Sequence, residues 1–478
     1  MGSHRAQRSP RAGWRGTVAG RVAPGAGTPP SADDMQDWPG RAGSRRGPSP
    51  VRGAKLYIPL VAVAVIVATI VTYAARADAR HVASAGHRTS AMTTSHAARA
   101  AGPRNGPVAP AALAPAAIGL RPGVTSPSAA GLPAAVALLP RLNSLQLAGQ
   151  RVIYSYKGLT PPSSLLWLIS HGEAAGVIFF TDNVGTPAHL AAVARQLQQA
   201  AAASTNPVHL PLLLMTDQEG GLVRRLPGPP VLSEKQVGQA AHPWQAATAA
   251  GAGAGSNLRG HGLNVNLAPV LDVYRQAGNF IDEFGRSFSS NPVRVAKLGA
   301  LYATAEQQAK VAATVKHFPG LGAATRSQNT DERPVTLRLT LPAIRSVDEL
   351  PYRSAIADRV KLVMVSWAIY PALDPKYPAG LSSTIVQGEL RNRLGFGGVT
   401  ITDALEAGAL GPFGSIASRA TLAARAGMDL LLCAAWKVSE GQTALHTLNS
   451  DYAHGTAAYQ AAFKAAVARV LALRKTLS

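Results

Sequence analysis

The sequence predicts an α/β protein in which a (β/α)8 TIM-type barrel follows a single transmembrane helix and disordered segments. From about residue 142 onward, short uninterrupted apolar runs alternate with longer Ala-rich stretches of helical character. Strands that are apolar along their whole length indicate a parallel sheet covered by helices on both faces. Further upstream, one long apolar segment without any charge lies between stretches rich in Arg, Gly, Pro and Ser.

The composition bounds the class of protein. The chain has 478 residues, of which 47% are hydrophobic and 15% are charged. This hydrophobic fraction excludes a wholly disordered protein, and the length suits one large barrel with additions. The single cysteine, Cys433, excludes an intramolecular disulfide and any multi-cysteine metal site. It lies in the apolar run LLLCAAW, which favours a buried and unreactive thiol.

The formal charge of +22 is spread over three parts of the chain. Residues 1–55 hold ten Lys and Arg against three Asp and Glu, residues 76–140 hold six against one, and residues 141–478 hold 31 against 21. No basic stretch is interleaved with aromatic residues, so we expect no nucleic-acid partner. The positive charge instead favours attraction to an anionic surface, such as lipid headgroups or an acidic cell wall.

The first element is a basic tail followed by a membrane segment. Residues 1–55 show no helical or strand period and are predicted to be a disordered cytoplasmic tail. Residues 56–75, from Leu56 to Ala75, carry no charge, and at about 1.5 Å per residue a helix of this length spans the roughly 30 Å hydrocarbon core. Because basic residues precede it, the N-terminus is expected in the cytoplasm and the rest of the chain outside the cell membrane.

The second element is a linker. Residues 76–140 are rich in Ala, Pro, Gly and Ser and are predicted to be a disordered tether to a domain formed by residues 141–478. A cleaved signal peptide is the alternative, because Ala75-Arg76-Ala77 resembles an A-x-A cleavage site. In that case the domain is secreted instead of anchored, and both alternatives export it.

The remaining elements build the barrel. An open doubly wound sheet is the alternative, but no G-x-G-x-x-G follows the first apolar run. Residues 456–477 place Tyr459, Phe463, Val467 and Leu471 at helical spacing, which predicts a closing helix packed on the barrel. Seven runs are candidate strands and an eighth is missing: 175–180, 211–218, 263–273, 312–318, 360–367, 397–404 and 428–433.

Functional side chains stand where several of these runs end. Asp217 follows LLLMT and Asp272 closes NLAPVLD. Lys316 and His317 follow AATV, and Asp403 follows GVTIT. In a barrel the C-terminal ends of the strands converge on one mouth, so we expect these residues to meet there and form a site.

Five motifs follow one another through roughly residues 142–435. They are DQEGG (217–221) with Arg224-Arg225, APVLDV (268–273), GRSF (285–288), KHFPGLG (316–322) and TDALEAGAL (402–410). Together they resemble glycoside hydrolase family 3, most of all its single-barrel β-N-acetylglucosaminidase (β-hexosaminidase) branch. The resemblance implies an exo-acting retaining hydrolase that removes terminal β-linked N-acetylglucosamine, often from cell-wall fragments such as peptidoglycan. It implies no metal and no organic cofactor.

The resemblance also implies a role for each matching residue. Asp403 matches the catalytic nucleophile, which forms a glycosyl-enzyme intermediate. Glu219 and Asp272 are expected to position other side chains of the site instead of contacting the sugar. The residues that match sugar-binding positions are Asp217, Arg225, Arg286, Lys316 and His317.

One segment departs from the family pattern. In the branch that this chain resembles, KHFPGHG is followed shortly by Asp-Ser-His, whose His is the general acid/base. Here Leu321 replaces the second His of the first motif, and Ser327-Gln328-Asn329 stands where Asp-Ser-His is expected. Neither Gln nor Asn can donate a proton to a leaving alkoxide, so another residue must supply it.

The nearest titratable residues are Asp331 and Glu332. We expect Asp331 to be the acid/base, because burial at the barrel mouth raises a carboxyl pKa towards neutrality. The alternative is a structural role, in which Asp331 caps the loop or pairs with Arg326 or Arg333. The segment therefore leaves a second function open, a sugar-binding pseudoenzyme at the cell surface. A β-glucosidase-type specificity is a third alternative, because the N-acetyl preference is implied by the resemblance alone.

Overall fold

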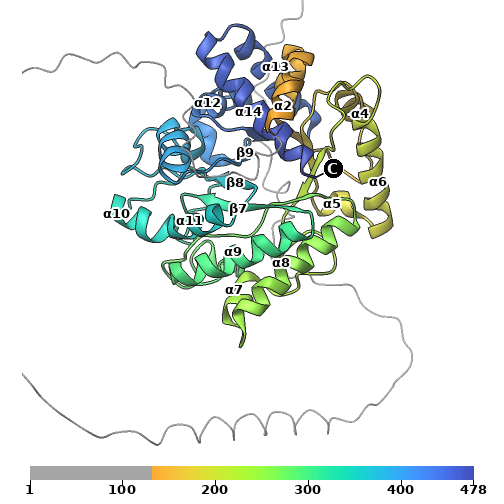
Figure 1. The fold of residues 1–478 in the computed structure, drawn as a ribbon. Coiled ribbons are helices and arrows are strands. Elements are labelled where there is room, and N and C mark those ends of the chain that lie inside the picture. The colour runs from red at the N-terminus through yellow and green to blue at the C-terminus, as the bar shows by residue number, and fades with distance from the viewer. Residues whose placement is uncertain (1–131, 478) are drawn as a thin grey trace, which may run out of the picture. The chain divides into compact units, whose positions relative to one another are not determined.

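The computed structural model describes residues 132–477, and Figure 1 shows their fold. Eight parallel strands close into a barrel in chain order, with helices around the outside. This confirms the barrel expected from the apolar runs. The barrel strands are β1 (Val152–Tyr154), β2 (Gly176–Ile178), β3 (Leu213–Thr216), β6 (Val265–Asn266), β7 (Ala312–Phe318), β8 (Leu362–Val365), β9 (Val399–Ala404) and β10 (Leu430–Leu432).

The strand that the sequence analysis missed is β1. It is only three residues long and lies between Arg151 and Ser155, so it gives no extended apolar run. It pairs in parallel with β10 on one side and β2 on the other, and it thereby closes the ring. A separate antiparallel hairpin, β4 (Gln218–Gly220) with β5 (Val223–Arg224), follows β3 directly.

Helices connect the strands and cover the barrel. In α6, for example, Thr186 caps the N-terminus by accepting from the backbone N–H of His189, and buried apolar residues recur along one face. The α-helices are α2 (Leu132–Leu138), α3 (Ser144–Gly149), α4 (Ser163–Ser170), α5 (Thr181–Val184), α6 (Pro187–Ala201), α7 (Glu234–Gln239), α8 (Pro243–Gly260), α9 (Pro292–Gln308), α10 (Leu341–Ala343), α11 (Leu350–Ala357), α12 (Ile416–Ala426), α13 (Val438–Ala453) and α14 (Ala457–Lys475). The short 3-10 and π-helical segments are η2 (Leu139–Arg141), η3 (Asp282–Phe284), η4 (Ile344–Asp348), η5 (Ala379–Leu381), η6 (Thr384–Arg393) and η7 (Gly408–Phe413).

The ordered domain extends further towards the N-terminus than the expected boundary at residue 141. Helix α2 lies inside the stretch expected to be a linker, and its Ala135 is buried in the hydrophobic core. The expected tail, the membrane segment at residues 56–75 and the linker up to residue 131 lie outside the described residues. None of the helices within residues 132–477 has the length and apolarity needed to span a bilayer.

The interior of the barrel is filled by one apolar cluster. Alternate residues of each strand point inward, as expected for a packed barrel. Val470 and Leu473 of α14 join this cluster, which confirms the closing helix. The strand residues of the cluster are Ile153, Ile178, Leu213, Met215, Val265, Ala312, Leu362, Met364, Val399, Ile401, Leu430 and Leu432.

Helix α14 closes the end of the barrel at which the strands begin. Its Arg474 donates to the carbonyl oxygens of Leu210 and Pro211, at 2.7 and 2.8 Å, just before β3 starts. Its Arg469 pairs with Asp429, just before β10, at 2.8 Å. We call the opposite end, at which the strands finish, the mouth.

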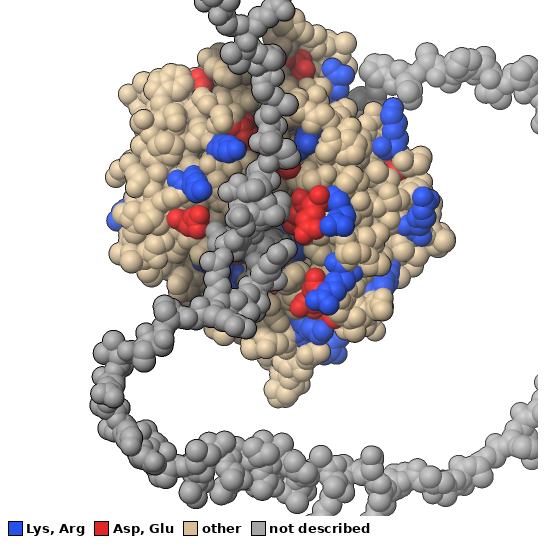
Figure 2. All heavy atoms as spheres, turned by 180° about the vertical axis from the view of Figure 1, so that it is seen from behind, with Lys and Arg blue, Asp and Glu red and all other residues tan. Residues whose placement is uncertain are grey.

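The surface charge forms no continuous basic face in the view of Figure 2. Lys and Arg side chains lie singly or beside Asp and Glu, and most of the visible described surface carries neither. Cys433 is buried and unpaired, as expected, and burial raises the pKa of its thiol.

Candidate active site

Three charged residues continue the inward-facing rows of the barrel strands into the mouth. Met215 and Ile401 both belong to the interior cluster. Asp217 lies two residues after Met215, and Asp403 lies two residues after Ile401, so strand alternation turns both side chains into the mouth. Lys316 stands in the same relation to β7, an even number of residues after an interior position.

A buried ion cluster links strand β7, the segment after β3 and the loop that carries Arg286. Lys316 Nζ lies 2.7 Å from Asp217 Oδ1 and 2.8 Å from Glu219 Oε1. Arg286 donates to Glu219 through two nitrogens, Nη2 to Oε1 at 2.8 Å and Nε to Oε2 at 2.9 Å. Glu219 thus holds both cations, which gives it the supporting role left open by the sequence.

Charge pairing keeps this cluster ionised although it is buried. Burial opposes ionisation of Glu219, but the charges of Arg286 and Lys316 outweigh it and lower the pKa of Glu219 to about 2. Burial likewise disfavours the Lys316 cation, yet Asp217 and Glu219 raise its pKa above the usual value. The site therefore offers fixed cationic donors and carboxylate acceptors, the groups that bind sugar hydroxyls strongly.

His317 is oriented by Asp272. Its Nδ1 lies 2.7 Å from Asp272 Oδ2, and the backbone N–H of Leu321 donates to Asp272 Oδ1 at 2.6 Å. Since a carboxylate only accepts, Nδ1 carries the proton, and Nε2 is left to accept from Arg286 Nη2 at 3.4 Å. Asp272 therefore fixes both the imidazole and the start of the following loop.

Arg286 reaches the cluster because the chain reverses just before it. Gly285 ends the 3-10 turn η3 in the left-handed region at φ 67°, where residues with a Cβ are disfavoured. A Cβ at this position would also lie 3.0 Å from Ser233 Oγ. The glycine of the GRSF motif thus sets the direction of the arginine that follows it.

Asp331 lies in the site, on a segment bonded to the β9 side of the mouth. The backbone N–H groups of Gly408 and Ala409 donate to the carbonyl oxygens of Asp331 and Thr330, at 2.7 and 3.0 Å. Gly408 follows Asp403 by five residues, so this contact brings the two aspartates to the same part of the mouth. Burial and the neighbouring Asp403 carboxylate raise the pKa of Asp331 to about 6, against the opposing charges of Arg286 and His317.

The two arginines considered as partners of Asp331 pair elsewhere. Arg326 forms an ion pair with Glu283, and Arg333 pairs with Glu332 at 3.0 Å. Asp331 instead has its own backbone N–H capped by Asn329 Oδ1 at 2.9 Å. The side chain is left free of the structural pairing that we considered as the alternative.

Two predicted residues stand apart from the ion cluster. Asp403 is half-buried, and its Oδ1 accepts the backbone N–H of Ala404 at 2.8 Å. Arg225 follows the β4–β5 hairpin, and its buried Nε has no hydrogen-bond partner within residues 132–477. No ion pair of the described residues joins either side chain to another group, so both remain available to a ligand.

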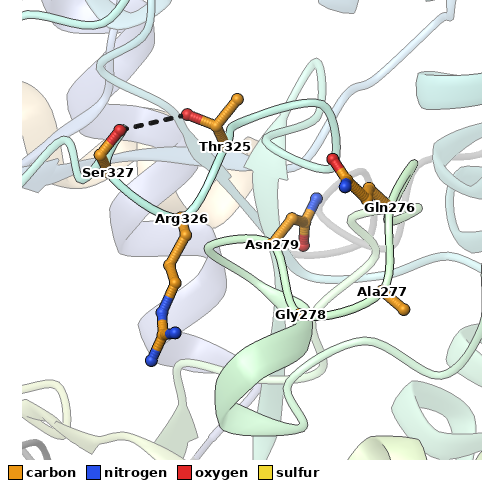
Figure 3. Close-up of a pocket in the computed structure, with 7 residues that line it drawn as sticks. All are labelled: Gln276, Ala277, Gly278, Asn279, Thr325, Arg326 and Ser327. Carbon is orange, nitrogen blue, oxygen red and sulfur yellow. Dashed lines mark hydrogen bonds between the residues drawn. The ribbon is translucent and has the colours of Figure 1, made fainter.

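A cavity of about 520 Å³ lies beside the segment that carries Asp331. Figure 3 shows its two walls, residues 276–279 from the loop after β6 and residues 325–327 from the loop after β7. Arg326 is its only titratable lining residue, and none of the predicted site residues lines it. The cavity is therefore not formed by the residues of the predicted site. No group of three or more His, Cys, Asp or Glu side chains in the described chain is arranged to hold a metal ion.

Comparison with known proteins decides the family. The family profile described as "Glycosyl hydrolase family 3 N terminal domain" matches residues 158–473. The chain belongs to glycosyl hydrolase family 3. This confirms the resemblance drawn from the five motifs, and it makes the chain a glycosyl hydrolase.

Three relatives show how far the likeness of this family 3 chain extends. An uncharacterized secreted glycosyl hydrolase of Arthroderma benhamiae is 47% identical over 331 residues, 69% of this chain and 93% of the relative. The structure of a family 3 β-N-acetylglucosaminidase from a Paenibacillus species is similar at TM-score 0.65 and 35% identity, covering 70% of this chain and 63% of that one. A β-N-acetylhexosaminidase from Beutenbergia cavernae is similar at TM-score 0.64 and 30% identity, covering 70% and 99%.

The family 3 site also contains a pair of carboxyls that the sequence analysis did not single out. Glu406 Oε2 accepts the backbone N–H of Ala434 at 3.2 Å, and Glu440 Oε2 accepts that of Ala435 at 2.9 Å. Burial, together with the neighbouring Glu440, raises the pKa of Glu406 well above its usual value. The place of Glu406 in TDALEAGAL, three residues after Asp403, is the sequence signal that could have identified it.

Proposed function

We propose that this family 3 domain is an exo-acting retaining hydrolase that releases terminal β-linked N-acetylglucosamine. Asp403 is the nucleophile and Asp331 the general acid/base. The observation that carries the proposal is that backbone hydrogen bonds hold the segments of these two aspartates together, and the charge of Asp403 helps to raise the pKa of Asp331 to about 6. Two carboxyls, one ionised and one protonated, are what retaining glycoside hydrolysis requires.

In the first step the Asp403 carboxylate attacks the anomeric carbon, and the bond from that carbon to the leaving oxygen breaks. Asp331 gives its proton to that oxygen, so an alcohol departs. The hydroxyls of the terminal ring are bound by Asp217, Lys316 and His317, whose positions are fixed by Glu219 and Asp272. These contacts hold the ring against the nucleophile.

In the second step water attacks the same carbon while Asp331 accepts its proton, and the bond to Asp403 breaks. The electrostatics favour this change of role. Once Asp403 is esterified it carries no charge, so its contribution to the raised pKa of Asp331 disappears and the carboxylate form becomes easier to reach. The same residue can therefore serve as acid first and as base afterwards.

The preference for N-acetylglucosamine is supported by the two solved relatives, each of which is named for hydrolysis of N-acetylhexosaminides. We propose cell-wall glycans such as peptidoglycan as the natural source of the sugar. The domain then works outside the cell, either anchored by residues 56–75 or secreted after cleavage near residue 77. Recovery of full-length protein in the membrane pellet supports the anchor, whereas a soluble form beginning near Asp78 contradicts it.

The proposal is tested by hydrolysis of an aryl N-acetyl-β-glucosaminide and an aryl β-glucoside by the wild-type chain and by Asp403→Asn. We expect turnover of the N-acetylated substrate and its loss in the variant by at least about 10³-fold, because the amide cannot form the glycosyl ester. Full activity of Asp403→Asn excludes it as the nucleophile. If the wild type prefers the glucoside, the proposed N-acetylglucosamine specificity is wrong and the domain is a β-glucosidase. If it binds sugar without turnover, the domain is a sugar-binding module and not an enzyme.

A further inference from the structure

Two aromatic side chains occupy the part of the mouth that the ion cluster leaves free. Around the barrel, β10, β1 and β2 lie between β9, which carries Asp403, and β3, which precedes Asp217. Phe180 follows β2 and packs against the apolar cluster of the barrel interior, so it lies at the top of that interior. Trp436 follows β10, and its ring centroid lies 4.9 Å from that of Phe180, with 53° between the ring planes. The two rings form a tilted corner, which we call the aromatic corner.

The backbone before Trp436 is held by three side-chain acceptors in succession. The N–H groups of Ala434 and Ala435 donate to Glu406 and Glu440, and that of Trp436 donates to Ser155 Oγ at 2.9 Å. Trp436 itself has a φ of 55°, in the left-handed region that a bulky residue rarely adopts. Backbone strain of this kind persists only where surrounding contacts impose it, and it collects at ligand sites.

The corner also holds an unused hydrogen-bond donor. The indole Nε1 of Trp436 is buried and has no acceptor among residues 132–477. A buried N–H without a partner is destabilising, and tryptophan usually places this group against an acceptor. The corner therefore combines two apolar ring faces with one donor that the described chain leaves without an acceptor.

The two halves of the mouth differ in polarity in the way that the two edges of a pyranose differ. The edge of the ring that carries C2, C3 and C4 presents its ring substituents in hydrogen-bonding range of cations and carboxylates, which suits Lys316, His317 and Asp217. The other edge carries C5 and the C6 hydroxymethyl group, with C–H groups and one hydroxyl, which suits aromatic faces and a single donor.

We propose that the aromatic corner is a specificity site for the C5–C6 edge of the terminal sugar. Phe180 and Trp436 pack against C5 and C6, and Trp436 Nε1 donates to the 6-hydroxyl oxygen. The site selects pyranosides that carry a hydroxymethyl group over analogues that lack the 6-hydroxyl. This inference rests on the proposed function, because it takes the terminal sugar to be the ring attacked by Asp403.

The test pairs a change in the protein with a change in the sugar. Wild type and Trp436→Phe, which keeps a ring and loses the donor, are compared on an aryl N-acetyl-β-glucosaminide and on its 6-deoxy analogue. We expect the wild type to lose about 5- to 10-fold in kcat/KM on the 6-deoxy substrate, the value of one hydrogen bond. Trp436→Phe should lose a similar factor on the parent substrate and nothing more on the 6-deoxy one.

Trp167→Phe is the matched control, because Trp167 lies exposed on the helix α4 and stacks on His171 instead of facing the mouth. Equal losses by Trp436→Phe on both substrates would mean a purely structural role and overturn the proposal. Binding of N-acetylglucosamine and its 6-deoxy form, measured by calorimetry, separates this question from catalysis. If the wild type binds both sugars with the same affinity, or binds neither, the aromatic corner does not recognise the 6-hydroxyl, even where the enzyme is active. If the wild type binds N-acetylglucosamine more tightly than the 6-deoxy form but shows no turnover, only the proposed function fails.

Discussion

At the residue scale, the proposed mechanism depends on how one aspartate raises the pKa of another. Asp331 is half-buried and close enough to Asp403 for that charge to raise its pKa, and its segment is fixed by two backbone hydrogen bonds from η7. A carboxyl placed in this way can do the work that a histidine does in the family pattern, although it stands at a different point of the loop. In the proposed mechanism, Asp331 therefore supplies the proton that the His of the Asp-Ser-His motif supplies in the family pattern.

Replacing Asp331 by Ala should impair substrates according to their leaving group. We expect a loss of about 10²–10⁴-fold in kcat/KM on oxygen-linked disaccharides, which need the proton, and a much smaller loss on dinitrophenyl glycosides, which do not. Added azide should restore turnover of the activated substrate and yield a glycosyl azide, since a small anion can replace water without a base. Glu332→Ala removes the exposed neighbouring carboxylate and should leave both substrates unaffected. Equal losses on both substrates in Asp331→Ala would make the residue structural.

The same residue predicts one limb of the pH profile. Because the acid must be protonated in the free enzyme, kcat/KM for an oxygen-linked substrate should fall tenfold per pH unit above about pH 6. This limb should be absent in Asp331→Ala and weak for dinitrophenyl substrates in the wild type. A descending limb that persists in Asp331→Ala assigns the titration to another group. The measurement is the rate at low substrate concentration between pH 4 and 9.

At the element scale, two carboxyls with raised pKa values, Glu406 and Glu440, hold the loop between β10 and α13 by accepting backbone N–H groups. Burial and Glu440 raise the pKa of Glu406, and burial raises that of Glu440. A carboxyl with a raised pKa binds its proton more tightly in the folded state. Its contribution to stability is thus complete below the unfolded pKa of about 4.5 and is lost as the pH rises through the folded value.

Glu406→Gln should therefore flatten the pH dependence of stability. The amide keeps a hydrogen-bond donor towards Glu440 and removes one of the two titrating groups, so the free energy of unfolding should fall less between pH 4.5 and neutrality than in the wild type. Denaturant unfolding at a series of pH values measures this difference. Glu332→Gln, an exposed carboxyl change, should reproduce the wild-type slope. A Glu406→Gln slope that matches this control would show that the pKa of Glu406 is not raised in the folded protein.

The elements were predictable where the pattern was long, and the site was predictable where motifs marked it. Runs such as 312–318 and 397–404 gave strands because uninterrupted apolar residues fit a buried parallel sheet. β1 gave no signal because ring closure, and not its own three residues, makes it a strand. The aromatic corner was missed for a similar reason. Phe180 and Trp436 are 256 positions apart in the sequence, and they meet because ring closure places β2 and β10 on either side of β1.

At the scale of the whole molecule, the barrel is asymmetric from end to end. The mouth carries the charged cluster, the two aspartates and the aromatic corner, whereas the other end is sealed by α14. The seal includes a fully buried cation: Arg474 donates to backbone carbonyls before β3 and also contacts Gln150, and burial lowers its pKa to about 9. The buried charge of Arg474 is thus stabilised by neutral backbone and amide dipoles and not by a carboxylate.

Arg474→Met is the variant that tests this seal. Methionine keeps much of the apolar stem but leaves the carbonyls of Leu210 and Pro211 without their donor, so the domain should lose about 3 kcal/mol in unfolding free energy and several degrees in Tm. Activity below the transition should be unchanged, because the residue lies at the opposite end from the mouth. Lys475→Met removes an exposed cation next to it and should leave Tm within about a degree. If the two variants melt together, α14 is held by the packing of Val470 and Leu473 alone, and the polar contacts of Arg474 contribute nothing to closing the barrel.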